Sequence, residues 1–445
     1  RDPATRQMVF DSLNRLVESS VLKRTNHFTF SLGKNNSLFE GIIQLTQRGS
    51  GFVVCDGEEK DIFIAPQNIG QALNGDSVKV RVFKKGPKRD EGAIVEIKER
   101  ARTQFVGTLQ FNQKGALLIP DNNRVSTEIQ ITKENLNGAR DGEKVLVKII
   151  AWPKSAGIPY GEVSSVIGIP GTNDTEMLSI LYNQGIDPIF PQAVINEAEF
   201  VPINLDSKEI EIRRDFRAIT TFTIDPLDAR DFDDAISFRK LENGHFEIGV
   251  HIADVSHYVR PGSAMDSEAL RRSNSVYLVD RVIPMLPEQL SNIACSLRPN
   301  EDKYTFSSVF EIDASGKVFA EWFGKTAIHS DRRFTYEEAQ EIIEGKDGDF
   351  KEEILIIDKI AKILRKARLN QGALSIESEE MRFKLDDKGN PNEVIIKTSK
   401  DAHKLVEEFM LLANRHVATH LSKPKKGKDL FPMVYRVHDV PDPAK

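Results

Sequence analysis

The sequence predicts a multidomain protein in which two small all-β barrels precede a larger domain of mixed strands and helices. Three observations support this prediction. Residues 39–97 contain five short β-type segments separated by turn residues, and a second copy of the pattern begins at Phe105. From Arg213 onward, strand-like alternation is mixed with long helical periodicity. At 445 residues the chain is long enough for three or four domains of ~100–200 residues each.

Composition restricts the class of protein. Hydrophobic residues make up 40% and charged residues 29% of the sequence, which is typical of a globular chain. The 61 basic and 67 acidic residues give a net charge of −6, so any nucleic-acid contact must come from local patches and stacking. The two cysteines are too few for a disulfide framework and indicate an intracellular, reducing compartment. No apolar run approaches the ~20 residues of a membrane span.

The amino-terminal segment, residues 1–36, predicts the remnant of a winged helix. Residues 8–22 carry helical periodicity, and residues 28–32 alternate as a strand does. Because the chain begins at Arg1 without Met and ends in a loop-like sequence at Lys445, we expect both ends to be cut.

Residues 37–100 predict a first barrel of the OB type, since five short strands with turns between them are typical of that fold. The expected strands are 41–45, 51–54, 61–65, 78–83 and 93–97. Two of them, in Gly49–Val54 and Asp61–Ile64, resemble the strand motifs with which cold-shock domains present aromatic rings to bases. Phe52 and Phe63, with Arg48 and Lys60 nearby, are therefore candidate RNA-binding residues, and a place in the barrel core is the alternative for each.

Residues 101–168 predict a second barrel of the same type. Phe105–Leu109 repeats Phe39–Ile43, and the Gly-Asp turn near Gly75 recurs near Gly142. Where the first barrel has its aromatic motif, the second has the aliphatic run Lys114–Ile119. We therefore expect backbone contacts or spacing, rather than base stacking, from this copy.

Residues 169–212 are punctuated by Gly and Pro and predict a connector, and residues 213–445 predict the mixed α+β domain. Strands are expected at 246–252 and 306–312, and helices at 353–369 and 402–421. The apolar stripe of the last helix predicts core packing.

The stretch from Asp225 to Asp234 places five carboxylates in ten positions, interleaved with hydrophobic residues. An acidic surface turn is the alternative for a lone motif of this kind, but the hydrophobic residues draw the segment toward a core, where clustered anions need a counter-charge. Mg²⁺ prefers oxygen ligands and leaves positions open for phosphate. An EF-hand is disfavoured because Ala235 stands at a ligand position. In an extended strand Asp231 and Asp233 share a face that Asp234 does not, so a bend near Asp233 and Asp234 is expected to gather them.

This stretch strongly resembles the Asp-rich signature of the ribonuclease II and ribonuclease R family of 3′-to-5′ exoribonucleases. Further blocks resemble that family in its own order: Gly249–Ser256, Ser275–Tyr277, Val282–Asn292 and Cys295–Leu297. Several blocks in the family's order are together far more specific than any one of them. The tandem barrels and the winged-helix remnant favour ribonuclease R within the family.

The resemblance implies processive hydrolysis of RNA to nucleoside 5′-monophosphates, in RNA turnover and quality control. It implies four catalytic, Mg²⁺-binding residues, which are Asp225, Asp231, Asp233 and Asp234, and Asp233 is expected to be the most critical of them. Two Mg²⁺ ions are expected at the transition state. Asp228 is expected to have a structural role. The resemblance also implies that Tyr277 lies against RNA near the cleavage point and helps to set the end product, whereas the residues alone predict an ordinary strand tyrosine.

The implied partner is RNA, single-stranded or structured with a 3′ overhang, and the implied setting is a cytoplasmic monomer without membrane or ATP. No Gly-x-x-x-x-Gly-Lys-Ser/Thr pattern occurs in the sequence. A later family block rich in arginine and a further RNA-binding barrel do not occur in the sequence either, so the fragment alone is expected to be inactive.

Two rival functions stay open: an RNA-binding relative without turnover, and a different metal-dependent nuclease. The histidines do not change this choice. His251 and His257 beside Asp254 predict packing rather than a transition-metal site, and His416 and His420 lack the glutamate of a zinc helix.

Overall fold

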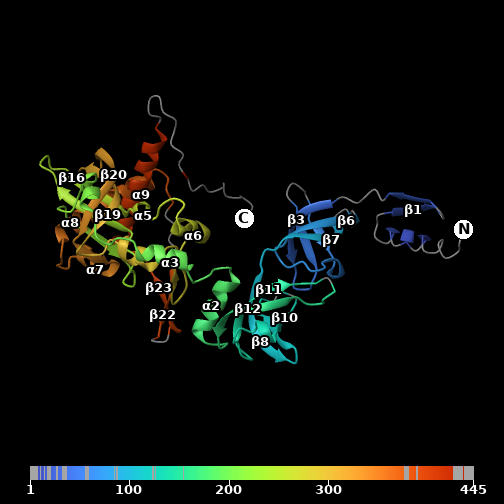
Figure 1. Ribbon diagram of the computed structural model, residues 1–445. Helices are drawn as coiled ribbons and strands as arrows, with labels where there is room; N and C mark the ends of the chain where they lie inside the picture. The colour runs from blue at the N-terminus through green and yellow to red at the C-terminus, as the bar shows by residue number, and fades with distance from the viewer. Residues whose placement is uncertain are drawn as a thin grey trace. The chain divides into compact units, whose positions relative to one another are not determined.

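A computed structural model shows the architecture of the chain (Figure 1). The described residues are 9–10, 12–14, 16–17, 22–26, 29–32, 38–55, 60–84, 86, 89–122, 125, 127–153, 155–374, 380–386, 389–423 and 434. The chain divides into two compact units, Arg1–Pro188 and Ile189–Lys445.

The predicted winged helix is described only in part. Residues 9–10, 12–14 and 16–17 are helical, and β1 (Leu22–Asn26) pairs antiparallel with β2 (Thr29–Leu32). The hairpin agrees with the prediction, but Leu22 begins a strand instead of ending the helix. The rest of residues 1–36 lies outside the described residues.

The first barrel is closed, with strand order β3-β4-β5-β7-β6. Its strands are β3 (Leu38–Leu45), β4 (Gly51–Val54), β5 (Ile62–Ile64), β6 (Ser77–Lys84) and β7 (Asp90–Glu99), and the short helix η1 (Pro66–Asn68) follows β5. All five predicted strands are confirmed. Alternate residues point inward, so Ile43, Val53 and Ile64 form a fully buried core.

The second barrel is also closed, with strand order β10-β12-β11-β8-β9. Its elements are β8 (Gln104–Asn112), β9 (Gly115–Pro120), β10 (Ile129–Thr132), η2 (Lys133–Asn135), β11 (Lys144–Ala151) and β12 (Tyr160–Gly168). The repeat is confirmed by two matched glycines. A Cβ at Gly41 would lie 2.2 Å from the carbonyl oxygen of Val54, and one at Gly107 would lie 2.2 Å from that of Ile119. Both strands must therefore carry glycine where they cross their neighbours.

The connector contains three helices: α2 (Asn173–Asn183), α3 (Gln192–Glu199) and α4 (Ser207–Glu211). Helix α2 belongs to the first unit, where Glu176 accepts a 2.6 Å hydrogen bond from Lys144 of the second barrel. Helices α3 and α4 belong to the second unit.

The second unit is built on a seven-stranded sheet with strand order β13-β20-β19-β16-β15-β14-β21. The strands are β13 (Arg214–Asp215), β14 (Thr221–Asp225), β15 (Asp234–Lys240), β16 (Phe246–Ala253), β19 (Glu301–Ile312), β20 (Val318–Ser330) and β21 (Arg332–Thr335). Neighbours are antiparallel except at the two ends, where β13 runs parallel to β20 and β21 parallel to β14.

Helices bury both faces of this sheet. One face packs on α7 (Tyr336–Ile343), α8 (Lys351–Asn370) and α9 (Asp401–Ser422), which confirms the two long predicted helices. The other face packs on α3, α6 (Ala264–Arg272) and the π-helical turn η3 (Gln289–Ala294). Period-two alternation divides the strands between the two cores: Ile236 and Phe238 enter the first, and Ala235 enters the second.

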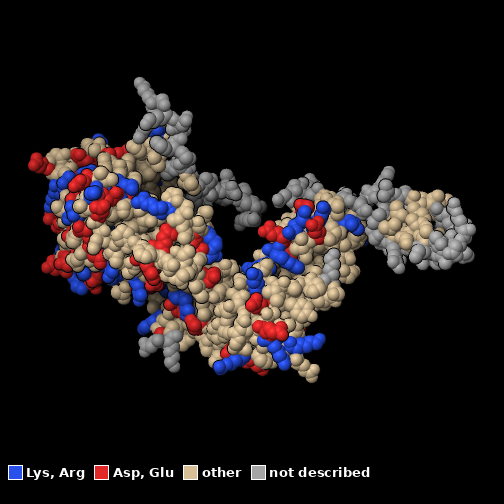
Figure 2. Space-filling view, in the orientation of Figure 1, with Lys and Arg blue, Asp and Glu red and all other residues tan. Residues whose placement is uncertain are grey.

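Smaller elements complete the second unit: α5 (Val255–Tyr258), β17 (Val276–Tyr277), β18 (Val282–Ile283), β22 (Glu380–Leu385) and β23 (Pro391–Lys397). The strands β17 and β18 form one two-stranded ribbon, and β22 and β23 form another. On the face shown in Figure 2, basic and acidic side chains are intermixed over residues 189–445, in keeping with the small net charge of −6. Within the described residues, no helix is both long enough and apolar enough to cross a bilayer.

Candidate active site

The acidic stretch forms the connection between two neighbouring strands of the large sheet. Asp225 is the last residue of β14 and Asp234 is the first residue of the antiparallel strand β15. Residues 226–233 turn the chain between them and contain no strand. The chain turns at residues 227–228 instead of near Asp233 and Asp234, where the bend was predicted, and the connection brings the first and last aspartates to the same end of the sheet.

Contacts from distant segments fix this connection. The hydroxyl of Ser296 donates to the carbonyl oxygen of Arg230 at 3.0 Å and accepts from the amide of Phe232 at 3.0 Å. The amide of Leu297 donates to the carbonyl oxygen of Phe232 at 2.8 Å. These bonds tie the connection to the segment that follows η3, which explains why the Cys295–Leu297 block accompanies the acidic block in the sequence.

Arg333, in β21, holds the other side of the connection. Its guanidinium donates to the carbonyl oxygens of Pro226 and Leu227, the latter at 3.1 Å, and lies 5.4 Å from the centre of the Phe232 ring. Its positive charge also lowers the pKa of Asp225, against the larger opposing effect of burial. Arg333 is thus a residue of the candidate site that the sequence did not predict.

Burial and mutual repulsion disfavour the charged form of three carboxylates. Burial raises the pKa of Asp225 to about 7, with a further increase from the charge of Asp234. Burial and the charge of Asp233 raise the pKa of Asp234 to about 6. Burial and the charge of Asp231 raise the pKa of Asp233. Clustered carboxylates that resist ionisation need a cation to hold them charged at neutral pH.

Two hydroxyl groups neighbour this cluster of carboxylates: one donates a hydrogen bond to it, and the other has its pKa raised by the charges of the cluster. The Thr223 hydroxyl donates to an Asp225 carboxylate oxygen at 2.5 Å. Tyr336 follows β21 directly, and burial together with the charges of Asp234 and Asp225 raises the pKa of its phenol to about 12. No signal in the sequence indicated this neighbourhood, because neither β21 nor its parallel pairing with β14 was predicted.

Tyr277 lies beside the cluster and remains open to solvent. Its side chain is 68% exposed. Burial of its hydroxyl end, the charges of Asp231 and Asp233, and a hydrogen bond to Asp231 raise the pKa of the phenol. The structure therefore brings Tyr277 and all four predicted aspartates together. Asp228 stands apart from this group, with a side chain that is 82% exposed and an ion pair of 3.9 Å to Arg382.

The donor chemistry of the cluster fits a divalent cation. The side chains are all carboxylates, and they lack the positive charge that their burial requires, which suits Mg²⁺. Among the described residues, however, no three His, Cys, Asp or Glu side chains converge as a ready ligand set for one ion. Asp225, Asp231, Asp233 and Asp234 are the residues that would hold Mg²⁺, and this ligand set, like the ion, stays a prediction.

The first barrel carries its two aromatic residues as a pair on adjacent strands. Phe52 is in register with Phe63, and their ring centres lie 5.5 Å apart in an edge arrangement. Both are half-buried, whereas their neighbours Val53 and Ile64 are fully buried in the core. The guanidinium of Arg89 lies 4.0 Å from the centre of the Phe63 ring. The outer face of the barrel thus presents two rings and a cation, rather than placing these rings in the core.

In the second barrel the corresponding strand β9 presents no aromatic side chain. Leu118 is fully buried and Leu117 half-buried, as a barrel strand requires. Leu73 of the first barrel packs in the core of the second, and the Gln71 side-chain amide donates to the Trp152 carbonyl at 3.3 Å. This copy holds the neighbouring barrel, which is compatible with the predicted spacing role.

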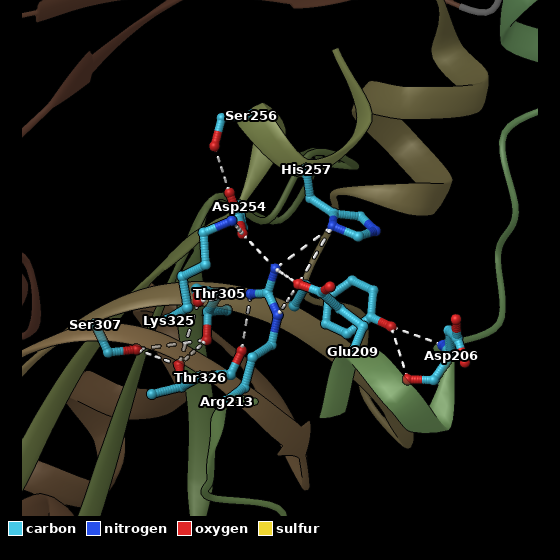
Figure 3. Close-up of polar contacts among 11 residues, drawn as sticks. Asp206, Glu209, Arg213, Asp254, Ser256, His257, Thr305, Ser307, Lys325 and Thr326 are labelled. Carbon is cyan, nitrogen blue, oxygen red and sulfur yellow. Dashed lines mark hydrogen bonds and ion pairs between the residues drawn. The ribbon is translucent and has the colours of Figure 1, made fainter. Parts of the chain in front are cut away.

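His257, near Asp254, belongs to a buried polar network (Figure 3). Arg213, with a fully buried side chain, donates to Asp254 at 2.7 Å and pairs with Glu209 at 2.8 Å. The His257 ring nitrogen lies 3.5 Å from the same guanidinium. This network fastens α4 to the sheet, so the structure supports packing and not a metal site here.

The other three histidines that the sequence singled out, His251, His416 and His420, also pack. His251 is fully buried between the hydroxyls of Ser307 and Ser237, at 2.6 and 2.8 Å, and burial lowers its pKa to about 3. In α9, the His416 ring lies 5.2 Å from that of Phe310, and the His420 ring lies 5.0 Å from that of Phe323. The predictions that set these residues aside agree with the structure.

Comparison with protein-family models assigns three regions of the chain. Residues 213–445 match the RNB domain, residues 118–191 match a cold-shock domain, and residues 41–97 match the ribonuclease B OB domain. These matches confirm the predicted architecture of OB-type barrels followed by a domain of the ribonuclease II type.

Known proteins resemble the chain over nearly all of its length. Ribonuclease R of Thermotoga maritima is 36% identical over 442 residues, which cover 96% of this chain and 61% of that relative. The chain therefore spans about three-fifths of the length of such relatives.

Solved structures share the fold. Ribonuclease R of Mycoplasma genitalium, in complex with ribose-methylated single-stranded RNA, superimposes with a TM-score of 0.78 at 25% identity and covers 86% of this chain and 61% of that one. Yeast Ssd1, a pseudonuclease, shares the fold alone, with a TM-score of 0.60 at 20% identity over 92% of this chain and 56% of that one. From its RNB domain, its OB-type barrels and its ribonuclease R relatives, the chain belongs to the ribonuclease R and ribonuclease II family.

Proposed function

We propose that the whole protein is a 3′-to-5′ exoribonuclease that hydrolyses RNA stepwise to nucleoside 5′-monophosphates with the help of Mg²⁺. One observation carries the proposal: the acidic connection places Asp225 and Asp234 at one end of the sheet, with Tyr277 exposed beside Asp231. The structure of the relative from M. genitalium is a complex with ribose-methylated single-stranded RNA, which supports the substrate class.

Each group of residues at the site has its own role in the proposed reaction. The four aspartates hold the cations, Arg333 and Ser296 keep the acidic connection in place, and the exposed Tyr277 ring offers a stacking surface to the terminal nucleotide. When bound, Mg²⁺ would supply an activated water and would neutralise charge on the phosphate, and we propose two such ions for the reaction. Phe52 and Phe63 of the first barrel bind the RNA strand by stacking on its bases.

The cellular setting forms part of the proposal. The sequence lacks a nucleotide-triphosphate loop, so we propose hydrolysis without ATP, by a cytoplasmic monomer that processively degrades RNA with a single-stranded 3′ end in turnover and quality control. Gel filtration of the full-length protein tests the monomer, and activity in nucleotide-free buffer tests the independence from ATP.

The test of function uses full-length protein, Mg²⁺, and one RNA sequence in linear and circular form. We expect ladders shortening from the 3′ end of 5′-labelled linear RNA, release of 5′-monophosphates, and an intact circle. Internal fragments from the circle would point instead to a different metal-dependent nuclease.

A pseudonuclease is the second candidate function, because the fold is shared with yeast Ssd1. It predicts RNA binding without release of nucleotides at any Mg²⁺ concentration. The four intact aspartates favour turnover over this alternative.

A further inference from the structure

The ribbon that carries Tyr277 is too small to fix its own position. Strands β17 and β18 contain two residues each, with Val276 opposite Ile283 and Tyr277 opposite Val282. An isolated two-stranded ribbon is at best marginally stable in water. The place of the Tyr277 ring beside Asp231 therefore depends on what holds the base of the ribbon.

Arg272, the last residue of α6, holds that base. Its side chain is only 6% exposed. Its guanidinium donates to the carbonyl oxygen of Pro284, the residue after β18, at 3.4 Å, and to that of Ile189 in the connector at 2.9 Å. It also lies 3.8 Å from the centre of the Phe190 ring. One side chain thus joins α6, the ribbon and the connector.

Glu268 sets the orientation of this guanidinium. Its carboxylate, 7% exposed, accepts from Nε of Arg272 at 2.8 Å, one helical turn away. Ser273 then ends the helix with φ at +67°, which turns the chain from α6 directly into the ribbon. This position requires the planar guanidinium of arginine, with its several N–H donors. The single ammonium group of a lysine could not contact a carboxylate, two carbonyl oxygens and an aromatic ring at the same time.

We propose that Arg272 is a positioning residue, whose guanidinium clamps the base of the ribbon and thereby sets where the Tyr277 ring meets the RNA. The role in RNA cleavage rests on the proposed exoribonuclease function. The role in holding the ribbon does not, so the two can be tested apart.

The first test measures hydrogen exchange of ribbon amides in the full-length protein. The reporters are the Leu278 amide, bonded to the Arg281 carbonyl at 2.8 Å, and the Met285 amide, bonded to the Ser275 hydroxyl at 3.0 Å. In Arg272→Met we expect exchange at least about tenfold faster, the factor that ~1.4 kcal/mol of lost clamping produces. Arg272→Lys keeps the positive charge beside Glu268 but loses the planar guanidinium, so it should show most of the increase in exchange rate. It replaces the Met variant if that variant folds poorly.

Arg214→Met is the matched control. Arg214 likewise pairs with a poorly exposed carboxylate, Glu247, at 2.8 Å and lies over aromatic rings, 4.7 Å from Phe216 and 5.0 Å from Trp322. It should lower overall stability without selective loss of protection in the ribbon. If both variants accelerated exchange of the ribbon amides equally, the proposal that Arg272 holds the base of the ribbon would be wrong.

The second test follows the length of the final product from 5′-labelled RNA. We expect Arg272→Met to shift that length in the same direction as Tyr277→Ala, and the double variant to add nothing further, because both changes act through one ring. Additive shifts, or a normal product with slower turnover, would overturn the positioning role. If the wild-type protein releases no nucleotides at all, the proposed function fails, and the exchange experiment still decides the clamp.

Discussion

Asp225 and Asp234 are the last and first residues of two adjacent antiparallel strands, so a single chain connection delivers both carboxylates to one end of the sheet. Burial raises the pKa of Asp225 to about 7 and that of Asp234 to about 6. Burial and mutual repulsion of carboxylates destabilise a structural core, but they favour the binding of a cation. The predictions below test this site and the elements around it.

Asp233→Asn is expected to abolish turnover while RNA binding stays near that of the wild type. The change removes a carboxylate without altering side-chain volume, and the loss of one negative charge should slightly favour a polyanion. Single-turnover assays and RNA titration of the full-length protein measure the two effects. Asp228→Asn, on the exposed side of the same connection, is the control and should retain activity. Comparable losses in both variants would refute the assignment.

Mg²⁺ is expected to raise the melting temperature of the protein. An ion that binds only the folded state stabilises it by ~2.7 kcal/mol at a concentration of one hundred times Kd. Asp225→Asn should blunt this increase, because it removes a proposed ligand. Scanning calorimetry with Mg²⁺ and with K⁺ at equal ionic strength checks the effect. An increase of equal size in the variant would place the ion elsewhere.

Replacing both Phe52 and Phe63 with Ala is expected to weaken single-stranded RNA binding by roughly 2–4 kcal/mol at most, from ~1–3 kcal/mol per stacked base. Because both rings are half-buried on the outer face, stability should fall less than the ~3–5 kcal/mol of a core Phe→Ala change. Val53→Ala, at a fully buried neighbour, is the converse control and should cost stability but not affinity. Unchanged affinity with a large loss of stability in the double variant would place the rings in the core.

Arg213→Met is expected to destabilise the second unit by about 3 kcal/mol or more, because it leaves the buried carboxylate of Asp254 without its closest cation. Lys325 also pairs with Asp254, at 3.4 Å, but its side chain is 42% exposed, so Lys325→Met should cost less than about 1 kcal/mol. Urea unfolding of both variants makes the comparison. Equal costs would show that burial does not govern this network.

Glu268 is expected to make the free energy of unfolding fall at acidic pH. Hydrogen bonds from Arg271 and Arg272 lower its pKa to about 2, against ~4.3 in an unfolded chain. A lowered pKa means that the stabilisation is present above pH ~4.3 and is lost as the pH falls toward 2. Glu268→Gln should therefore flatten the fall in the free energy of unfolding over this interval, by up to about 2 kcal/mol after allowance for solvent screening at Arg271. A variant with an unchanged slope would contradict the shift.

Local signals in the sequence predicted much of the fold. Alternation and turn residues located all five strands of the first barrel, and helical periodicity located α8 and α9 to within a few residues. Leu22 was misplaced because a leucine at the end of a helical pattern fits the start of a strand equally well. The acidic stretch and Tyr277 were predicted because each lies in a contiguous block of the chain, whereas the turn within the acidic stretch lies earlier than expected, at residues 227–228.

The sequence by itself determined the identities and order of the site residues, since carboxylates interleaved with hydrophobic residues limit the chemistry wherever they lie. Only the tertiary structure decided which distant residues reach them. Arg333 and Tyr336 come to Asp225 through the parallel pairing of β14 with β21, and Arg272 reaches the ribbon through a buried guanidinium. Strand order and side-chain burial arise from packing between segments far apart in the chain, and no local pattern of residues encodes that packing.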